Sequence, residues 1–208
     1  LAEVMGVSQF LWEDFLRMQH ESLFPVLVDT SSLDQTKRSE HLQAALSGQL
    51  RSASDAETAI RYLNRFKDRE MFRIDLRHIT GRVDFVRFAR EITALTGVVV
   101  GATVELVEGA LKPRYGRPGL AEGSDCKWCV CALGKFGGRE MGFGSDIELM
   151  FIYEAEGETD GPERVMNSTF YGELVKGFLQ TLQARREGIF QVDLRLRPYG
   201  GKGALASS

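Results

Sequence analysis

The chain has 208 residues, 43% of them hydrophobic and 26% charged, which is typical of a globular protein with a sizeable apolar core. Its formal net charge of −3 argues against a domain whose main task is to bind nucleic acid, because that task usually needs a basic surface. No apolar run approaches the ~20 residues that span a bilayer, and the first residues do not form a signal peptide, so we expect no membrane partner.

The first half of the chain predicts helices, since it holds only 4 of the 22 glycines. A first helical segment follows a possible cap at Ser8. A capping box, in which Ser54 caps an early helix amide and Glu57 reaches back, predicts a second helix that ends before Gly81. A further helix is expected over residues 84–108.

The second half mixes strand and helix patterns after a connector that contains Pro113 and Gly116. The expected elements are a buried strand at Trp128–Leu133, a strand at Asp146–Tyr153, a helix that Pro162 opens and Gly188 ends, and a strand at Ile189–Arg197. The pattern predicts an α+β fold, with a helical region over residues 1–110 packed on a small sheet with flanking helices over residues 111–208. The start without an initiator Met and the abrupt end favour a fragment of a longer protein.

The second predicted strand carries a pair of carboxylates. Asp146 and Glu148 share one face of it while Ile147 and Leu149 take the other, because side chains alternate along a strand. Their Cα atoms would lie roughly 6–7 Å apart, so both carboxylates could reach one or two metal ions. Oxygen ligands favour magnesium or manganese over zinc. The same pattern also occurs on the solvated face of an ordinary strand.

A glycine-rich segment with one lysine follows the first predicted strand. Its residues of phosphate-binding type are Gly134, Lys135, Gly137 and Gly138. Glycines let backbone amides approach a phosphate closely, and the lysine adds positive charge. The segment is not a Walker A loop, because Cys129 and Phe136 stand where that motif needs Gly and Ser or Thr.

The last predicted strand supplies a third carboxylate beside two arginines. Asp193, Arg195 and Arg197 share one face of this strand, and Leu194 and Leu196 are expected in the core. A carboxylate for metal and two guanidiniums for phosphate oxygens suit nucleotidyl transfer. A structural ion-pair ladder is the alternative.

Together these motifs resemble the polymerase-beta-like nucleotidyltransferase superfamily. More narrowly, Leu133–Tyr153, Gln191–Gly203 and Asn64–Ile74 resemble the glutamate–ammonia-ligase adenylyltransferase family, which modifies glutamine synthetase. Members of that family carry two related catalytic halves. One half transfers AMP from ATP to a tyrosine of glutamine synthetase, and the other removes it by phosphorolysis and releases ADP. The stretches FGSDIEL and RPYGGKGAL resemble slightly more the AMP-removing half.

The resemblance implies a set of site residues and partners. Asp146, Glu148 and Asp193 are the implied catalytic ligands of Mg²⁺ or Mn²⁺, although the family usually has Asp at the place of Glu148. The implied nucleotide- or phosphate-binding residues are Gly134, Lys135, Gly137, Gly138, Ser145, Arg195 and Arg197. The implied partners are ATP, ADP or phosphate, glutamine synthetase as protein substrate, and a regulatory signal protein that acts through the full-length enzyme.

Two other functions stay open. One is a non-catalytic, nucleotide-binding regulatory module that retains the fold. The other is nucleotidyl transfer to another hydroxyl acceptor.

The remaining motifs carry no predicted chemistry. Cys126, Cys129 and Cys131 fit a reducing cytoplasm, since an odd number of cysteines cannot form a disulfide framework and no fourth zinc ligand is near. Residues 65–70 form a mixed-charge helix face, expected to be solvated or salt-bridged between helices. His78 is expected to be a helix-end residue.

Overall fold

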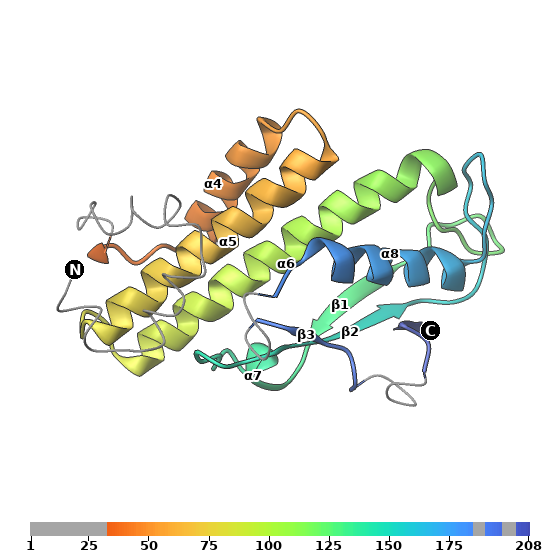
Figure 1. The fold of residues 1–208 in the computed structure, drawn as a ribbon. Coiled ribbons are helices and arrows are strands. Elements are labelled where there is room, and N and C mark those ends of the chain that lie inside the picture. The colour runs from red at the N-terminus through yellow and green to blue at the C-terminus, as the bar shows by residue number, and fades with distance from the viewer. Residues whose placement is uncertain (1–32, 185–189, 197–202) are drawn as a thin grey trace. The chain divides into compact units, whose positions relative to one another are not determined.

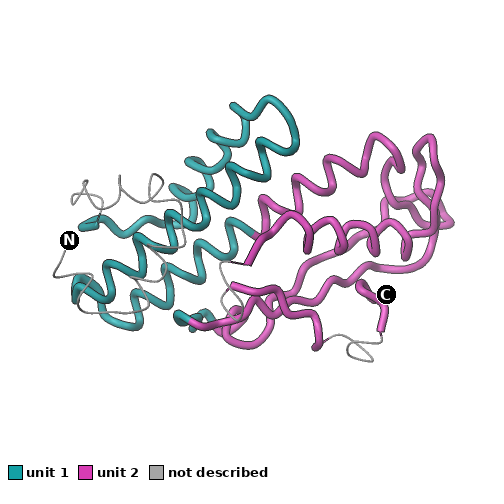
Figure 2. The backbone as a smooth tube through the Cα atoms, viewed as in Figure 1, with its two compact units in different colours: residues 1–99, 139–143 teal, residues 100–138, 144–208 magenta. Residues whose placement is uncertain are grey.

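The structure, a computed structural model, describes residues 33–184, 190–196 and 203–208 (Figure 1). The predicted helical segment after Ser8 lies outside these residues, as do Gly188 and Arg197. The chain divides into two compact units (Figure 2). Unit 1 comprises residues 1–99 and 139–143, and unit 2 comprises residues 100–138 and 144–208.

Helices and a small mixed sheet make up the part of the chain that the structure describes. In chain order the elements are α4 (Ser39–Arg51), α5 (Ala56–Ile79), α6 (Phe85–Tyr115), β1 (Trp128–Ala132), α7 (Gly134–Gly137), β2 (Ile147–Tyr153), α8 (Asn167–Thr181), β3 (Val192–Asp193) and β4 (Ala206–Ser207). This composition confirms the predicted α+β class. The units divide inside α6, after Val99, whereas the sequence pattern set residues 1–110 apart from 111–208.

Helix α5 begins one residue later than the predicted capping box implies. The Asp55 side chain is the cap and accepts a hydrogen bond from the Thr58 amide at 2.7 Å, while the Ser54 hydroxyl donates to Asp55 at 2.8 Å. These bonds, chiefly the one from the Thr58 amide, hold the pKa of Asp55 below its usual value. The helix ends at Ile79 and is followed by Gly81 at a φ of 71°, which confirms the predicted end.

A buried ion-pair network joins α5 to the first half of α6 within unit 1. Arg73 donates to Glu70 at 2.8 Å and lies 3.7 Å from Glu91, while Arg77 pairs directly with Glu91. All four side chains are at most 4% exposed. Of the mixed-charge residues 65–70, Lys67 and Glu70 are buried and ion-paired, Asp68 and Arg69 are partly exposed, and Arg65 is exposed.

The two arginines also hold the segment that precedes α4. Arg77 donates to the Leu33 carbonyl at 2.8 Å and to the Thr36 hydroxyl at 3.0 Å, and Arg73 donates to the Gln35 carbonyl at 3.2 Å. These bonds pair most of the guanidinium N–H groups that burial has removed from water, although Nη2 of Arg73 has no hydrogen-bond partner among the described residues.

Helix α6 runs seven residues beyond its predicted end at Glu108, to Tyr115, and includes Pro113. It is the one described helix long and apolar enough to cross a membrane by length and composition. About a third of its most apolar stretch is buried, and the helix also buries the ion-paired Glu91 and the hydroxyl of Thr96, which donates to the Ile92 carbonyl.

The sheet of unit 2 is built around β2. Strand β1 pairs with β2 antiparallel, and β3 and β4 pair with it parallel. The side chains of β2 alternate, and the buried ones are Ile147, Leu149, Phe151 and Tyr153. Helix α8 covers this face: the Phe151 and Phe178 rings lie 5.4 Å apart, and Tyr153 stacks on Tyr171 at 4.8 Å (Figure 1).

Two of the predicted elements in unit 2 need correction. Strand β1 is an edge strand in the described sheet and buries none of its side chains, whereas a buried strand was expected. Helix α8 begins at Asn167 and not at Pro162, because the chain before it forms turns and bridges that end at Met166. The Asn167 side chain then donates to the Gly119 and Ala155 carbonyls, both at 3.0 Å, and fixes where the helix starts.

Replacing Glu91 with Ala is expected to lower the free energy of unfolding by about 3–5 kcal/mol, because it leaves two buried arginines without their acidic partner on α6. Urea denaturation followed by circular dichroism measures this loss. The control is Arg87→Ala, which removes an exposed pair with Asp84 and should change stability by no more than about 0.5 kcal/mol. Equal effects of the two substitutions would contradict the structural role of the network.

Candidate active site

Three carboxylates project from one face of the sheet in unit 2. Asp146 directly precedes β2, and Glu148 lies within it, at positions that alternate with the buried Ile147 and Leu149. Strand β3 runs parallel to β2 and places Asp193 directly opposite Glu148. Since paired residues project to the same side, the structure confirms the predicted alternation and brings Asp193 to the face of the other two carboxylates.

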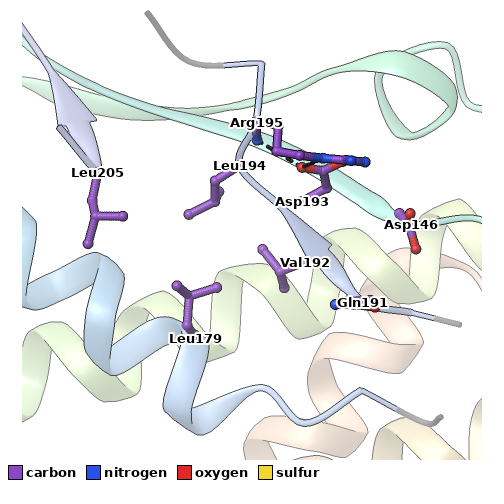
Figure 3. A pocket seen from close by; sticks show the side chains of 8 residues that line it. All are labelled: Asp146, Leu179, Gln191, Val192, Asp193, Leu194, Arg195 and Leu205. Atoms are coloured by element: carbon purple, nitrogen blue, oxygen red, sulfur yellow. Dashed lines mark hydrogen bonds and ion pairs between the residues drawn. The ribbon is translucent and has the colours of Figure 1, made fainter. Parts of the chain in front are cut away.

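Asp146 lines a pocket of about 540 Å³. The other lining residues are Leu179, Gln191, Val192, Asp193, Leu194, Arg195 and Leu205 (Figure 3). The Oδ1 atom of Asp146 is buried and has no hydrogen-bond partner among the residues that the structure describes. A buried carboxylate oxygen without a donor is costly, so this atom favours a ligand that supplies positive charge.

Glu148 lies against the backbone of Gly134. A Cβ atom added at Gly134 would lie 1.4 Å from Oε2 of Glu148, and Gly134 has a φ of 49°, which favours glycine. The Leu133 amide also donates to the Glu148 carbonyl at 2.9 Å. Gly134 therefore gives the Glu148 carboxylate its space, a role that the sequence pattern did not assign.

The other residues of the glycine-rich segment form the short helix α7 and its end. The Gly137 amide donates to the Leu133 carbonyl and the Gly138 amide to the Gly134 carbonyl, both at 2.9 Å. These two amides, expected to face a phosphate, are thus already used by the backbone. Lys135 is exposed on α7 and is accessible to a ligand, whereas Ser145 is buried.

Arg195 folds back onto Asp193. Its Nε atom lies 3.0 Å from both carboxylate oxygens, and its Nη2 atom donates to Oδ2 at 2.7 Å (Figure 3). The hydrogen bond with Asp193 raises the pKa of Arg195 most, and the negative charges of Asp146 and Glu148 raise it further. All three carboxylates therefore act electrostatically on one guanidinium.

The predicted strand at Ile189–Arg197 is too long, since among the described residues 190–196 only Val192 and Asp193 form strand. Strand β3 ends at Asp193, and Arg195 and Leu196 form a turn in which Leu196 is 54% exposed and not in the core. The physical reason is a local hydrogen bond, because the Asp193 carboxylate accepts the Arg195 amide at 2.8 Å, as Asp does in turns. The prediction for Arg197 lies outside the described residues.

The donor set suits a hard divalent cation, since it consists of carboxylate oxygens and includes the buried, unpartnered oxygen of Asp146. As the side chains stand, no group of three His, Cys, Asp or Glu residues among those described is close enough to hold a metal ion. Arg195 occupies the Asp193 carboxylate. Because Arg195 bonds to both oxygens of Asp193, a cation at this carboxylate would compete with it.

Residues 139–143 belong to unit 1 and pack within it. The Phe143 ring stacks on Phe88 at 4.4 Å and lies 5.6 Å from His78, and Met141 is fully buried. His78 lies in the last turn of α5, as predicted, but it also supports this segment. The contact joins segments far apart in the chain, so no local pattern signals it.

Comparison with known proteins identifies the family. A family model described as Glutamate-ammonia ligase adenylyltransferase matches residues 1–208, the whole chain. The chain belongs to this family. The match confirms the resemblance that the carboxylate and glycine motifs carry.

Several relatives are named bifunctional glutamine synthetase adenylyltransferase/adenylyl-removing enzyme. The one from Thioalkalivibrio sulfidiphilus is 32% identical over 91% of this chain and 20% of its own length. The one from Aromatoleum aromaticum is 35% identical over 80% of this chain and 20% of its own length, and the one from Brucella suis is 31% identical over 100% of this chain and 21% of its own length. The chain thus spans about a fifth of the length of these relatives.

Gly134→Ala is expected to destabilise the chain by at least ~1 kcal/mol, because an L-residue is strained at this positive φ and its Cβ would displace Glu148. Thermal unfolding measures the loss. The matched control is Gly172→Ala in α8, where a Cβ meets nothing within 4 Å, and helix propensity predicts unchanged or slightly higher stability. A Gly134→Ala protein as stable as Gly172→Ala would show that Glu148 does not depend on this glycine.

Proposed function

We propose that this chain is the catalytic unit of a magnesium-dependent nucleotidyltransferase that adds or removes AMP on a tyrosine of glutamine synthetase and so regulates nitrogen assimilation. The observation that carries the proposal is the buried, unpartnered Oδ1 of Asp146 on the sheet face that also carries Glu148 and Asp193. The names of the relatives, which include glutamine synthetase, support the choice of protein substrate.

Asp146, Glu148 and Asp193 are the residues that would hold magnesium or manganese. When bound, the ion supplies Lewis-acid stabilisation of the negative charge on phosphate oxygens. The chain contributes the carboxylate oxygens and their rigid placement on two paired strands, with Glu148 fixed against Gly134. Glu148 has a longer side chain than the Asp usual in the family, and the absence of a side chain at Gly134 accommodates it.

Arg195 and Lys135 would position the phosphate oxygens of the nucleotide. A guanidinium binds phosphate oxygens in the same bidentate way in which Arg195 now binds Asp193. Exchange of Arg195 from Asp193 to phosphate would free the carboxylate for the cation. The exposed Lys135 adds a second positive charge from the segment beside Glu148. Ser145 and Arg197 stay predicted ligands by family resemblance.

The sequence favours the half that removes AMP, with phosphate as co-substrate and ADP as product. We further propose a cytoplasmic location, which the three free cysteines support, and control by a regulatory signal protein through the full-length enzyme.

A second function is a regulatory module that binds nucleotide without catalysis. The Arg195–Asp193 pair favours it, because Arg195 already neutralises one of the three carboxylates. A third function is nucleotidyl transfer to another hydroxyl acceptor. A transfer assay with labelled nucleotide distinguishes it, because the label then appears on that acceptor and not on glutamine synthetase.

The deciding experiment incubates the purified chain with magnesium in two reactions. One contains phosphate and adenylylated glutamine synthetase, and the other contains ATP and the unmodified enzyme. Release of ADP in the first, or incorporation of AMP in the second, supports catalysis. Nucleotide binding without turnover in either reaction would favour the regulatory module.

Asp146→Asn is expected to remove most divalent-cation binding and to lower turnover by about 10²-fold or more, because metal-held charge stabilisation is worth several kcal/mol. Manganese binding followed by electron paramagnetic resonance, beside the turnover assay, measures both effects. A control with Asp125→Asn, an exposed carboxylate outside the site, should bind and turn over as the wild type does. Equal manganese binding by both variants would refute the role of Asp146.

Arg195→Ala is expected to bind manganese several-fold more tightly in the absence of nucleotide, since it removes the cation that competes for Asp193. The same variant should bind nucleotide more weakly, because a phosphate ligand is lost. Arg195→Lys keeps the charge but not the bidentate geometry. Its affinities for manganese and for nucleotide should lie between those of the wild type and those of Arg195→Ala. Calorimetric titrations measure the affinities, and weaker manganese binding by Arg195→Ala would contradict the proposed exchange.

A further inference from the structure

Two cysteines lie side by side on the outer strand of the described sheet. The sulfur atoms of Cys129 and Cys131 are 3.8 Å apart. The residues are two positions apart on β1, so they share one face, and Cys131 lies opposite Met150 on the face that carries Glu148. Cys129 is exposed and Cys131 is half-buried, so reagents in solution can reach the pair.

Cys126 differs from Cys129 and Cys131 in its burial and in its contacts. It is buried, and its thiol lies 3.7 Å from the Lys127 carbonyl and 3.6 Å from the Ala155 carbonyl. It is therefore a structural thiol and a matched internal control for reactivity.

A bond between the two sulfurs requires a distortion of β1, because a disulfide needs Cβ atoms about 3.5–4.5 Å apart and side chains two apart on a strand point the same way. A disulfide needs Cα atoms about 4.4–6.8 Å apart. Residues i and i+2 of an extended strand lie roughly 6.4–6.8 Å apart, at the upper end of that range. In the described part of the sheet β1 pairs only with β2, so its free edge lets it shorten or twist. Disulfides formed under such strain are easily reduced.

We propose that Cys129 and Cys131 form a redox-active dithiol that closes reversibly to a disulfide by exchange with small-molecule disulfides of the glutathione class. This proposal does not depend on a catalytic role of Asp146, Glu148 or Asp193.

The exchange proceeds in two balanced steps. The exposed Cys129 thiolate attacks the small disulfide, whose S–S bond breaks, and one thiol leaves after taking up a proton. Cys131 then loses its proton to solvent and attacks the Cys129 sulfur, and the second small thiol leaves. The hydrogen bond with Cys129, and then burial, raise the pKa of the Cys131 thiol, so Cys131 acts as the second, resolving cysteine. Overall the two cysteines are oxidised and one small disulfide is reduced to two thiols.

Closing the disulfide should disturb the segment that follows β1. Ala132 and Leu133 lead directly into Gly134, and the Leu133 amide donates to the Glu148 carbonyl. Shortening of β1 would move the Leu133 amide relative to the Glu148 carbonyl and weaken this hydrogen bond. Oxidation is therefore expected to make the backbone around Gly134 less ordered.

The test treats the reduced chain with excess oxidised glutathione and follows its mass. The expected product has lost two hydrogen atoms, carries no glutathione, contains a Cys129–Cys131 bond in its peptide map and returns to the dithiol with a thiol reductant. Cys131→Ser should stop at a stable glutathione adduct on Cys129, whereas Cys126→Ser should still close. Hydrogen exchange of the Leu133 amide should be faster in the oxidised chain.

Three results would overturn the proposal. One is a wild-type chain that keeps glutathione on Cys129 or does not react. Another is a disulfide that includes Cys126. The third is unchanged exchange at Leu133 in the oxidised chain. All three are measured on the wild-type chain, so the test does not depend on whether a variant folds.

Discussion

The alternation of side chains along β2 is the constraint on which unit 2 depends. Each described strand of the sheet pairs with β2, so the orientation of β2 sets that of the others. Burial of Ile147, Leu149 and Phe151 under α8 forces the residues between them to the opposite face. A slip of one residue would expose that apolar set and bury Glu148, so the register is strongly determined.

The same constraint places negatively charged side chains close to one another. Asp146, Glu148 and Asp193 bring like charges to one face, and their repulsion is unfavourable until a cation neutralises it. Arg195 provides a positive charge from within the chain and bonds to Asp193 through a turn that also ends β3. A side chain that stabilises the carboxylates in this way also competes with a metal ion for them. The proposed function therefore involves an exchange of cations at Asp193.

The backbone next to Glu148 is restricted by its neighbour Gly134. Gly134 leaves room for Glu148, which fits the longer acidic side chain that this member of the family carries. The Cys129–Cys131 pair lies on the strand that leads into Gly134, so a change there acts on the segment that holds Glu148.

The sequence alone predicted the features that rest on local periodicity or on local motifs. The alternation on β2, the end of α5 before Gly81, the α+β class and the family resemblance are of this kind. The face that Asp146 and Glu148 share follows from the same alternation, since apolar residues two apart must be buried together.

Tertiary structure decided the features that depend on partners distant in the chain. Strand β1 is an exposed edge because, among the described strands, it pairs only with β2. Arg73 and Arg77 on α5 are buried because α6 brings Glu91 to them. Arg195 faces Asp193 because a turn, and not a longer strand, follows β3. A helix or strand pattern specifies which side chains face a core, but which atoms meet them there depends on how distant segments pack.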